Sequence, residues 1–276
     1  MKKKILSLAL ILVMVFALVR AVAAAPVSLP STVQPGRFLA AIEPPASDSI
    51  PISNRTELAA MSKDLSGKYH LTADIDLSDG AWVPIGYDNS YYSRTSTKFE
   101  GIFDGQGHII RNLAVVNINV YKPMGWSVYS YTGLFGCASS TAIIKNVGLI
   151  GANINIDIDI NNRDDIVLTT SLGSVIYSGG ICGYGGNISN CFTTGTVSSI
   201  TTSNYRSTVY AGGISGVYGN ISNCYNTASV SVTSDGIYAE AYAGGLCGYN
   251  FAGFSVANCF TASLCYALKG LEKEAY

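Results

Sequence analysis

The chain has only two histidines, His70 and His108, and this scarcity limits the hydrolytic chemistry open to it. A zinc protease needs two histidines one helical turn apart, together with a glutamate, so that both imidazoles face one metal. Neither histidine has that setting, and neither lies beside a Gly-x-Ser-x-Gly turn that would supply a serine nucleophile. Zinc hydrolysis is therefore excluded, and a serine hydrolase triad has no support.

Charge is also scarce. Between residues 166 and 268 the only charged residues are Arg206, Asp235 and Glu240. No basic patch lies beyond the first 20 residues, so nucleic acid is not an expected partner. With so little charge, we expect the exposed positions to be mostly Ser, Thr, Asn and Tyr.

The first 24 residues read as a secretory signal peptide. Lysines occupy positions 2–4, an apolar run without charge covers 5–19, and small residues follow at 21 and 23–25. The apolar run is shorter than the about 20 residues that a membrane-spanning helix requires. We place cleavage after Ala23 or Ala24 and expect a secreted or cell-surface protein without a membrane span. Removing the leader leaves 13 basic and 18 acidic residues.

Residues 25–51 contain six of the eight prolines, which predicts an extended Pro-rich linker. Residues 52–66 then predict an N-terminal capping helix. Asn54 and Glu57 have the spacing of a capping box, and Leu58, Met61 and Leu65 fall on one helical face.

An internal repeat organises the rest of the chain. The sequence Gly-Gly-Ile-Cys-Gly at 179–183 recurs as Gly-Gly-Ile-Ser-Gly at 212–216 and Gly-Gly-Leu-Cys-Gly at 244–248. Each copy follows a tyrosine at a fixed offset and precedes an Asn-Cys-aromatic unit, with the asparagines at 190, 223 and 258. Gly180 and Gly213 are 33 residues apart, and Gly213 and Gly245 are 32 apart. A constant period of this size is typical of a solenoid.

The repeat is too rich in Gly, Ser, Thr and Val for a helical solenoid. It divides into three short strands: one through the Gly-Gly-Ile segment, one through Ile-Ser-Asn-Cys-Phe, and one from Val197 towards Val209. We therefore predict an all-β fold, a right-handed parallel β-helix over residues 67–263, in which the glycines and the asparagines of successive repeats superpose. A β-propeller-like repeat is the alternative, although its blades need about 40 or more residues.

Several of these motifs resemble a known family. The Gly-Leu-x-Gly units at 133–136 and 245–248 are similar to the GLUG motif of bacterial surface proteins. The segments Trp-x-Pro-Ile-Gly at 82–86 and Phe-Glu-Gly-x-Phe-Asp-Gly at 99–105 also resemble the lead-in that such proteins carry. The resemblance covers about residues 52–262, with Ile in place of Leu at 181 and 214. It implies an extracellular β-helical region of adhesin-like proteins, some of which are attached to IgA-cleaving metalloproteases.

A β-helical glycosidase or lyase is the enzymatic alternative, and it would need paired carboxylates or a Ca²⁺ site. The candidates are Asp74, Asp76, Asp104, Asp157, Asp159, Asp164 and Asp165. Asp104 precedes Gly105 and reads as a turn residue, and Asp157 and Asp159 alternate with isoleucines as on the solvent face of a strand. We expect structural roles for these residues, no enzymatic activity, no metal site and no cofactor.

Cysteines and aromatics recur in register with the repeat. Three of the seven cysteines (191, 224, 259) share one repeat position, and two more (182, 247) share another with a serine between them. This pattern favours unpaired core thiols, and a disulfide framework is the alternative in an exported chain.

Two aromatic ladders are expected, one of Phe192, Tyr225 and Phe260 and one of Tyr177, Tyr210 and Tyr242. Such ladders stabilise a sheet, and the tyrosines are the candidate ligand-binding residues if their strip is exposed.

From residue 264 to 276 the repeat pattern breaks, which predicts an irregular tail and suggests a piece of a longer surface protein. A final coil without a cap leaves unpaired backbone groups, so end-to-end self-association is expected.

The functional hypotheses are an adhesin-like or stalk module that binds extracellular carbohydrate or protein, a carbohydrate-active enzyme, and a partial remnant of a larger protein. The sequence does not name a ligand.

Overall fold

The computed structural model describes residues 40–86, 97–116, 127–160, 173–203 and 205–270. The chain divides into two compact units, residues 1–34 and 35–276, and every described residue belongs to the second. The expected leader of residues 1–24 and the expected linker as far as residue 39 lie outside the described residues.

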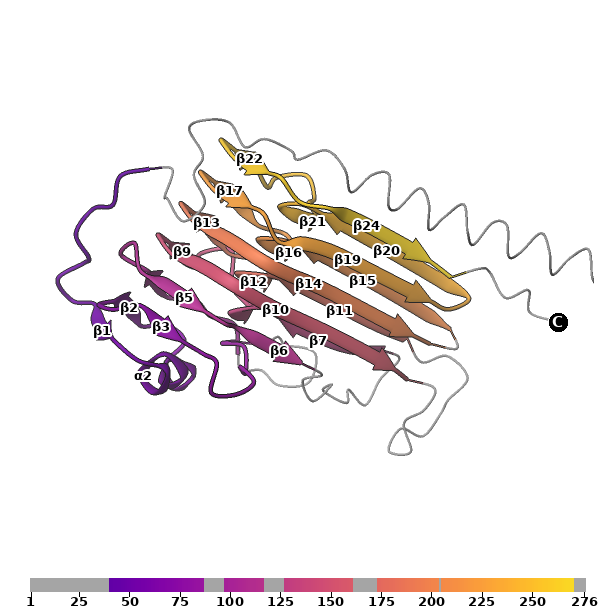
Figure 1. Cartoon of the computed structure of the whole chain (residues 1–276), viewed down its shortest axis with the longest axis horizontal. Helices are drawn as coiled ribbons and strands as arrows, with labels where there is room; N and C mark the ends of the chain where they lie inside the picture. The colour runs from indigo at the N-terminus through magenta and orange to yellow at the C-terminus, as the bar shows by residue number, and fades with distance from the viewer. Residues whose placement is uncertain (1–39, 87–96, 117–126, 161–172, 204, 271–276) are drawn as a thin grey trace, which may run out of the picture. The chain divides into compact units, whose positions relative to one another are not determined.

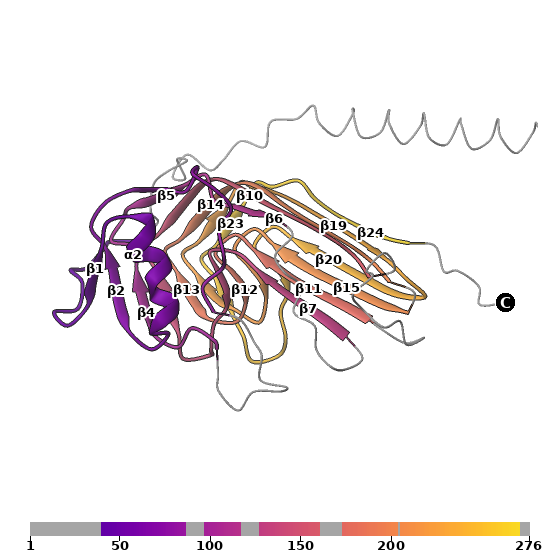
Figure 2. The same cartoon turned by 90° about the horizontal axis from the view of Figure 1, so that it is seen from below.

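A short helix stands at the N-terminal end of the stacked strands, as Figures 1 and 2 show. It comprises α2 (Arg55–Ala60) and the 3-10 turn η1 (Met61–Lys63). The side chain of Asn54 caps it by accepting the Glu57 N–H at 3.0 Å, while the Glu57 carboxylate accepts from the Ser53 N–H at 2.7 Å. Leu58 and Met61 are fully buried, as the helical spacing predicted.

The helix is shorter than expected. Asp64 is extended, and its carboxylate accepts the backbone N–H of Ser66 at 3.1 Å, which forms a turn in place of a further helical turn. The chain then enters the strands.

Four sheets make up the fold. Sheet A has seven strands, in the spatial order β1 (Ile50–Ile52), β2 (Lys68–Leu71), β4 (Ile102–Asp104), β9 (Ile143–Lys145), β13 (Asn187–Ser189), β17 (Asn220–Ser222) and β22 (Val256–Ala257). Strand β1 starts at Ile50, so the end of the expected linker belongs to the sheet.

Sheet B has nine strands. Two of them are long: β10 pairs with both β5 and β6 along one edge, and β14 pairs with both β18 and β19 along one edge. Its members are β3 (Ile75–Asp76), β5 (Ile109–Arg111), β6 (Ala114–Val116), β10 (Gly148–Asp159), β14 (Phe192–Thr202), β18 (Tyr225–Asn226), β19 (Ser229–Asp235), β23 (Phe260–Thr261) and β24 (Cys265–Lys269).

Sheets C and D have four strands each. Sheet C contains β8 (Phe135–Cys137), β12 (Cys182–Tyr184), β16 (Ser215–Val217) and β21 (Cys247–Tyr249). Sheet D contains β7 (Ser127–Thr132), β11 (Gly173–Gly179), β15 (Arg206–Gly212) and β20 (Tyr238–Gly244).

From β7 onward the chain visits the sheets in the constant order D, C, A, B, and we call one such pass a coil. Every strand pairing among the described residues is parallel. The all-β class is confirmed, and the parallel pairing disfavours a propeller, whose sheets are antiparallel. The expectation of three strands per repeat is wrong, because the segment expected from Val197 towards Val209 is split between β14 in sheet B and β15 in sheet D.

The repeated glycines allow the chain to turn from sheet D into sheet C. In the register, Gly179 pairs with Gly212 and Gly212 with Gly244. A Cβ atom at Gly179 would lie 2.0 Å from the carbonyl oxygen of Cys182, and one at Gly212 would lie 2.1 Å from that of Ser215. Only glycine leaves room for this close backbone approach, which explains its recurrence.

The repeated asparagines form the corner after sheet A. Asn146, Asn190, Asn223 and Asn258 have φ angles of 56°, 52°, 52° and 53°. Asparagine tolerates this left-handed conformation better than most residues. The preceding residues Ser189, Ser222 and Ala257 are in register, so the predicted superposition of the asparagines is confirmed.

The interior combines an apolar core with a hydroxyl-rich layer. Sheet A contributes a fully buried column of Ile144, Ile188 and Ile221. Sheets B and D instead meet through buried hydroxyls, including Ser178–Ser199 at 2.6 Å and Ser207–Ser234 at 2.7 Å. Serine and threonine, which the sequence led us to expect at exposed positions, therefore also line part of the interior, where they bond to one another.

None of the seven cysteines, all of which lie among the described residues, forms a disulfide, as the repeat pattern favoured. Four are buried: Cys137, Cys182, Cys191 and Cys224. Burial raises the pKa of the Cys182 thiol to about 12 and that of Cys224 well above its ordinary value. These thiols behave as small apolar core residues.

The last coil is open in the part of the chain that the structure describes. Strand β24 pairs in parallel with β19, so the expectation of an irregular tail from residue 264 is wrong for 265–269, while 271–276 lie outside the described residues. All five residues of β24 are exposed, and Tyr266 and Leu268 are 51% and 57% exposed. Among the described residues, no helix is long and apolar enough to cross a membrane.

Candidate functional site

The predicted tyrosine ladder is present on sheet D. Tyr177 pairs with Tyr210, and Tyr210 with Tyr242. The ring centroids of Tyr177 and Tyr210 are 5.5 Å apart with planes 5° from parallel, and those of Tyr210 and Tyr242 are 4.9 Å apart at 7°. Tyr131 on β7 adds a fourth ring, 5.1 Å from Tyr177. The sequence signal for Tyr131 was available, because it precedes Gly133 at the offset that Tyr177 has from Gly179.

Tyrosines of sheet C cover one flank of this ladder. Tyr184 on β12 packs edge-on against Tyr177, with centroids 5.3 Å apart and planes at 82°. Tyr249 on β21 meets Tyr242 at 5.3 Å and 61°. This second row was not predicted from the sequence, although each of its tyrosines follows the repeated glycine motif directly.

The ring orientation limits what the ladder can bind. A sugar stacks on the face of an aromatic ring, whereas the ladder rings face one another. Burial is the main influence that raises the pKa of Tyr210 to about 12, and it raises that of Tyr177 further. The ladder hydroxyls are therefore neutral at physiological pH, and the inner rings stabilise the sheet more than they present a stacking platform.

Two exposed and two half-buried aromatic rings gather in the last two coils. We use the name aromatic surface for Tyr218, Tyr249, Phe251 and Phe254. Phe251 and Tyr249 are 55% and 36% exposed. Tyr218 joins the group through centroid distances of 6.2 Å to Phe251 and 5.7 Å to Phe254. These rings are not stacked face to face, so they leave apolar area open to a ligand.

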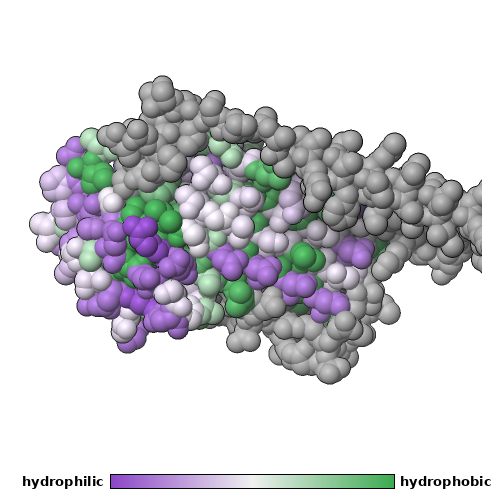
Figure 3. Space-filling model, viewed as in Figure 1, coloured by the Kyte–Doolittle hydropathy of each residue, from purple (hydrophilic) through white to green (hydrophobic). Residues whose placement is uncertain are grey.

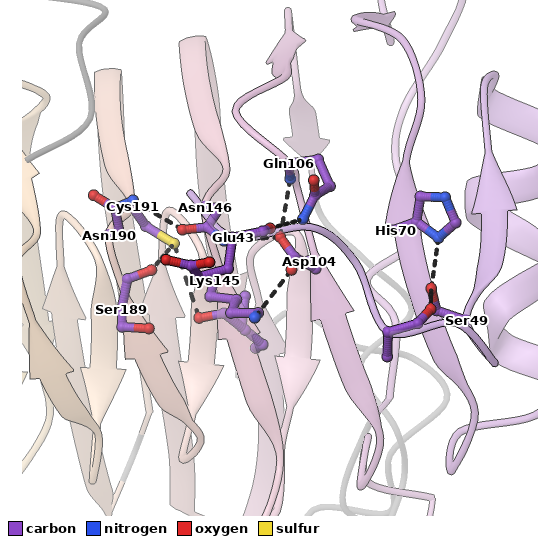
Figure 4. Close-up of polar contacts among 12 residues, drawn as sticks. Glu43, Ser49, His70, Asp104, Gln106, Lys145, Asn146, Ser189, Asn190 and Cys191 are labelled. Atoms are coloured by element: carbon purple, nitrogen blue, oxygen red, sulfur yellow. Dashed lines mark hydrogen bonds and ion pairs between the residues drawn. The ribbon is translucent and has the colours of Figure 1, made fainter. Parts of the chain in front are cut away.

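The carboxylate candidates have structural partners. Asp104 is 4% exposed and accepts the Asn146 side-chain N–H at 2.9 Å and the Gln106 backbone N–H at 3.0 Å, while Lys145 Nζ lies 3.0 Å away (Figure 4). Burial is the largest influence on Asp104 and raises its pKa, but the hydrogen bonds from Asn146, Gln106 and Lys145 outweigh it and lower the pKa overall. Asp104 therefore holds a corner together.

Asp74 and Asp76 lie at an exposed edge near His108. The Ile109 N–H bonds to Asp74 at 2.9 Å and holds its pKa below the usual range, and His108 Nδ1 lies 3.3 Å from the same oxygen. The Asn112 side chain donates to Asp76 at 2.9 Å and lowers the pKa of that carboxyl. Both groups are low-pKa acceptors, whereas a general acid needs a raised pKa.

The remaining sequence candidates are dispersed. Asp157 and Asp159 lie on β10 and alternate with the buried Ile156, Ile158 and Ile160, as predicted. A line of hydrophilic residues follows β10 in Figure 3. Asp164 and Asp165 lie outside the described residues. His70 contacts Ser49 Oγ at 2.7 Å and is not grouped with a second histidine. The described residues contain no group of three or more His, Cys, Asp or Glu side chains that could hold a metal ion.

Comparison with known proteins supports the fold. A solved structure of a "putative immunoglobulin A1 protease from Bacteroides ovatus" matches this chain with a TM-score of 0.52 and 24% sequence identity. The match covers 82% of this chain and 60% of that protein's chain, so the chain corresponds to only part of its length. No protein-family model matches the chain. No curated protein matches it either.

Proposed function

We propose that this chain is an extracellular β-solenoid module of a bacterial surface protein, adhesin-like or stalk-like, which binds carbohydrate or protein outside the cell. The parallel coils form a right-handed parallel β-helix in this proposal, and residues 1–24 direct export. The resemblance to GLUG-motif proteins and the structural likeness to a protein named for immunoglobulin A1 cleavage both support an extracellular setting.

The observation that carries the proposal is the aromatic surface. It provides exposed rings next to a neutral repeat region, where the described residues from 238 to 270 include only Glu240 and Lys269 as charged groups. Aromatic residues supply large contact area at low conformational cost, and a neutral surround disfavours ionic ligands. A neutral glycan or an uncharged protein surface therefore fits this region best.

A β-helical hydrolase or lyase has less support. The carboxylates of Asp74, Asp76 and Asp104 accept hydrogen bonds that lower their pKa values. None of the three is then suited to donate a proton to a leaving group at neutral pH.

The test is a binding screen of the secreted chain against arrays of extracellular glycans and matrix proteins. Tyr249→Ser combined with Phe251→Ala should weaken binding by about tenfold or more, because exposed aromatic anchors dominate such contacts. Tyr205→Ser is the matched control, since Tyr205 is 39% exposed and lies outside the aromatic surface. Binding that is unchanged by the double substitution, or no binding in either array, would contradict the proposal.

A further inference from the structure

A segment that precedes β1 lies across the asparagine corner of several coils. We call residues 40–49 the arm. The Ala40 N–H donates to Asn190 Oδ1 at 2.9 Å, and Asn190 Nδ2 donates to the Ala40 carbonyl at 3.2 Å. Gln106 Nε2 donates to the Glu43 carbonyl at 2.9 Å. Figure 4 shows Asn190, Asn146 and Gln106 following one another across neighbouring strands, with Glu43 of the arm beside them.

The side chains beneath the arm form what we call the amide track: Gln106, Asn146 and Asn190. Residues on the far side of the track from the arm decide which way the amide groups of Asn146 and Asn190 are oriented. Asp104 can only accept when ionised, so Asn146 turns its Nδ2 towards it, at 2.9 Å. The Oδ1 of Asn146 then accepts from Asn190 Nδ2 at 2.8 Å. Asn190 is left with one N–H and its oxygen directed at the arm, which is the pairing that an extended backbone residue needs.

The spacing of the track matches an extended peptide. Asp104 pairs with Lys145, and Lys145 pairs with Ser189. Asn190, which follows Ser189, is therefore two coils away from the corner that contains Gln106. Two coils span about 9.6 Å at ~4.8 Å per strand, and the three residue-to-residue steps from Ala40 to Glu43 span about 10 Å when extended. Pro44 and Pro45 hold the arm near the extended conformation before it docks.

The first part of the arm is held through its backbone, and its later part also through side chains. Ala40, Ala41, Glu43 and Pro44 are all exposed, and the arm contacts the track through the main-chain atoms of Ala40 and Glu43. Asp48 pairs with Lys68 at 2.6 Å, and Ser49 Oγ contacts His70 Nδ1 at 2.7 Å. A turn from Ala46 to Ser49, closed by a 3.0 Å backbone hydrogen bond, joins the arm to β1. Opening this turn, together with the contacts of Asp48 and Ser49 with β2, would free the arm without unpairing β1.

We propose that the amide track is a binding site for an extended peptide backbone, which the arm occupies in cis and which the arm of a second copy of this chain occupies in trans. The arm is the segment that occupies the amide track in this structure. A second copy could place its own arm there with the same contacts, so exchange requires no additional binding surface. The cis arm benefits from a high effective concentration, so exchange rises with protein concentration.

The experiment uses the full chain with a photo-crosslinking benzoylphenylalanine in place of Ile42, between the two anchored residues of the arm. Isotopically heavy and light copies are mixed, incubated and irradiated, and mass spectrometry separates crosslinks within one copy from those between copies. We expect crosslinks from position 42 to peptides that contain Asn146 or Asn190, with a heavy–light fraction that grows with concentration.

Asn190→Gly tests the track, since glycine keeps the left-handed corner and removes the amide. It should lower both kinds of crosslink by about tenfold, the ratio expected from two lost hydrogen bonds. Gln106→Gly is a second variant that removes the other anchor. Asn258→Gly, at the same corner of the last coil with φ 53°, is the matched control and should leave crosslinking unchanged. Crosslinks that persist in both track variants would overturn the site, and crosslinks confined to single copies at every concentration would overturn the exchange.

Discussion

The two ends of the strand stack differ in how they meet solvent. At the N-terminal end, α2 and η1 bury Leu58 and Met61 completely, and Arg55 bonds to the backbone carbonyls of Leu77 and Ala81. At the other end, β22 and β24 are exposed throughout, and Leu264 and Leu268 are 54% and 57% exposed. The same parallel pairing thus ends once under a packed helix and once on an open coil.

Surface polarity follows the same division. Figure 3 shows strongly hydrophilic residues concentrated around the first strands and α2, and paler residues over much of the repeats. Ion pairs such as Lys68–Asp48 at 2.6 Å and Arg55–Asp79 at 2.7 Å belong to the N-terminal end. Natural sheet edges are normally protected by charge or a covering element. The N-terminal end has both, whereas the described part of the last coil has no covering element and only Glu240 and Lys269 as charged groups.

Truncating the cap core should have the largest effect. Leu58→Ala removes a fully buried side chain and should lower the free energy of unfolding by about 2–5 kcal/mol. Leu268→Ala removes a side chain that is 57% exposed and should change it by less than about 0.5 kcal/mol. Urea denaturation of both variants measures the difference. Equal losses would mean that the two ends are not distinct.

Asp104 should make the N-terminal half sensitive to acid. Its pKa is lowered in the fold, so its stabilising contribution is complete above the unfolded value of about 3.9 and is lost as pH falls through the folded pKa. Asp104→Asn should therefore cost about 1–3 kcal/mol at pH 7, and the gap from the wild type should close below about pH 4.

Urea titrations at pH 7 and pH 3 test this expectation. Asp157→Asn on the exposed face of β10 is the control and should stay within about 0.5 kcal/mol of the wild type at both values. A deficit in Asp104→Asn that is the same at both pH values would show that the charge of Asp104 is not the stabilising feature.

The open coil should promote self-association of the chain expressed without residues 1–24. Light scattering should show a mass that rises with concentration, because unpaired strand edges recruit further strands. Replacing Leu264 and Leu268 with lysine should shift the distribution to monomer. Val83→Lys, at a 72% exposed position near the other end, should not. A stable monomer at high concentration would indicate that the open coil is protected.

The smallest expected effect is a difference in thiol reactivity between the last coil and the core. Cys265 on β24 is exposed, so it should react first with a thiol reagent in the folded protein. Burial raises its pKa, so the rate should increase as pH rises and the thiolate fraction grows. Cys265→Ser should abolish the fast phase. Rapid modification of Cys191 or Cys224 without denaturant would contradict their placement in the core.

The sequence was sufficient for features that repeat with a fixed spacing. The ladder of Tyr177, Tyr210 and Tyr242 and the superposed asparagines follow from register alone, because each coil repeats the geometry of its neighbour. The helix cap at Asn54 followed from local hydrogen bonding. These features depend on spacing or on adjacent residues.

Features that depend on contacts between distant segments could not be predicted in this way. The arm contacts Asn190 across 150 residues of sequence. Whether Ser178 and Ser199 face solvent or each other depends on how sheets B and D pack, which a strand pattern does not specify. The strand at Cys265–Lys269 was missed because it lacks the repeat motif and takes its place from pairing with β19.

Hydrogen exchange of backbone amides along the stack tests the contrast between the ends most directly. Peptide-resolved exchange of the full chain should show strong protection in α2, β2 and β4, comparable to that of β13 to β17. Protection should then fall through β22, β23 and β24, where one neighbouring coil is absent from the described structure. Protection in β22 to β24 equal to that in β13 to β17, or faster exchange at α2 and β2 than at the last coil, would contradict the account.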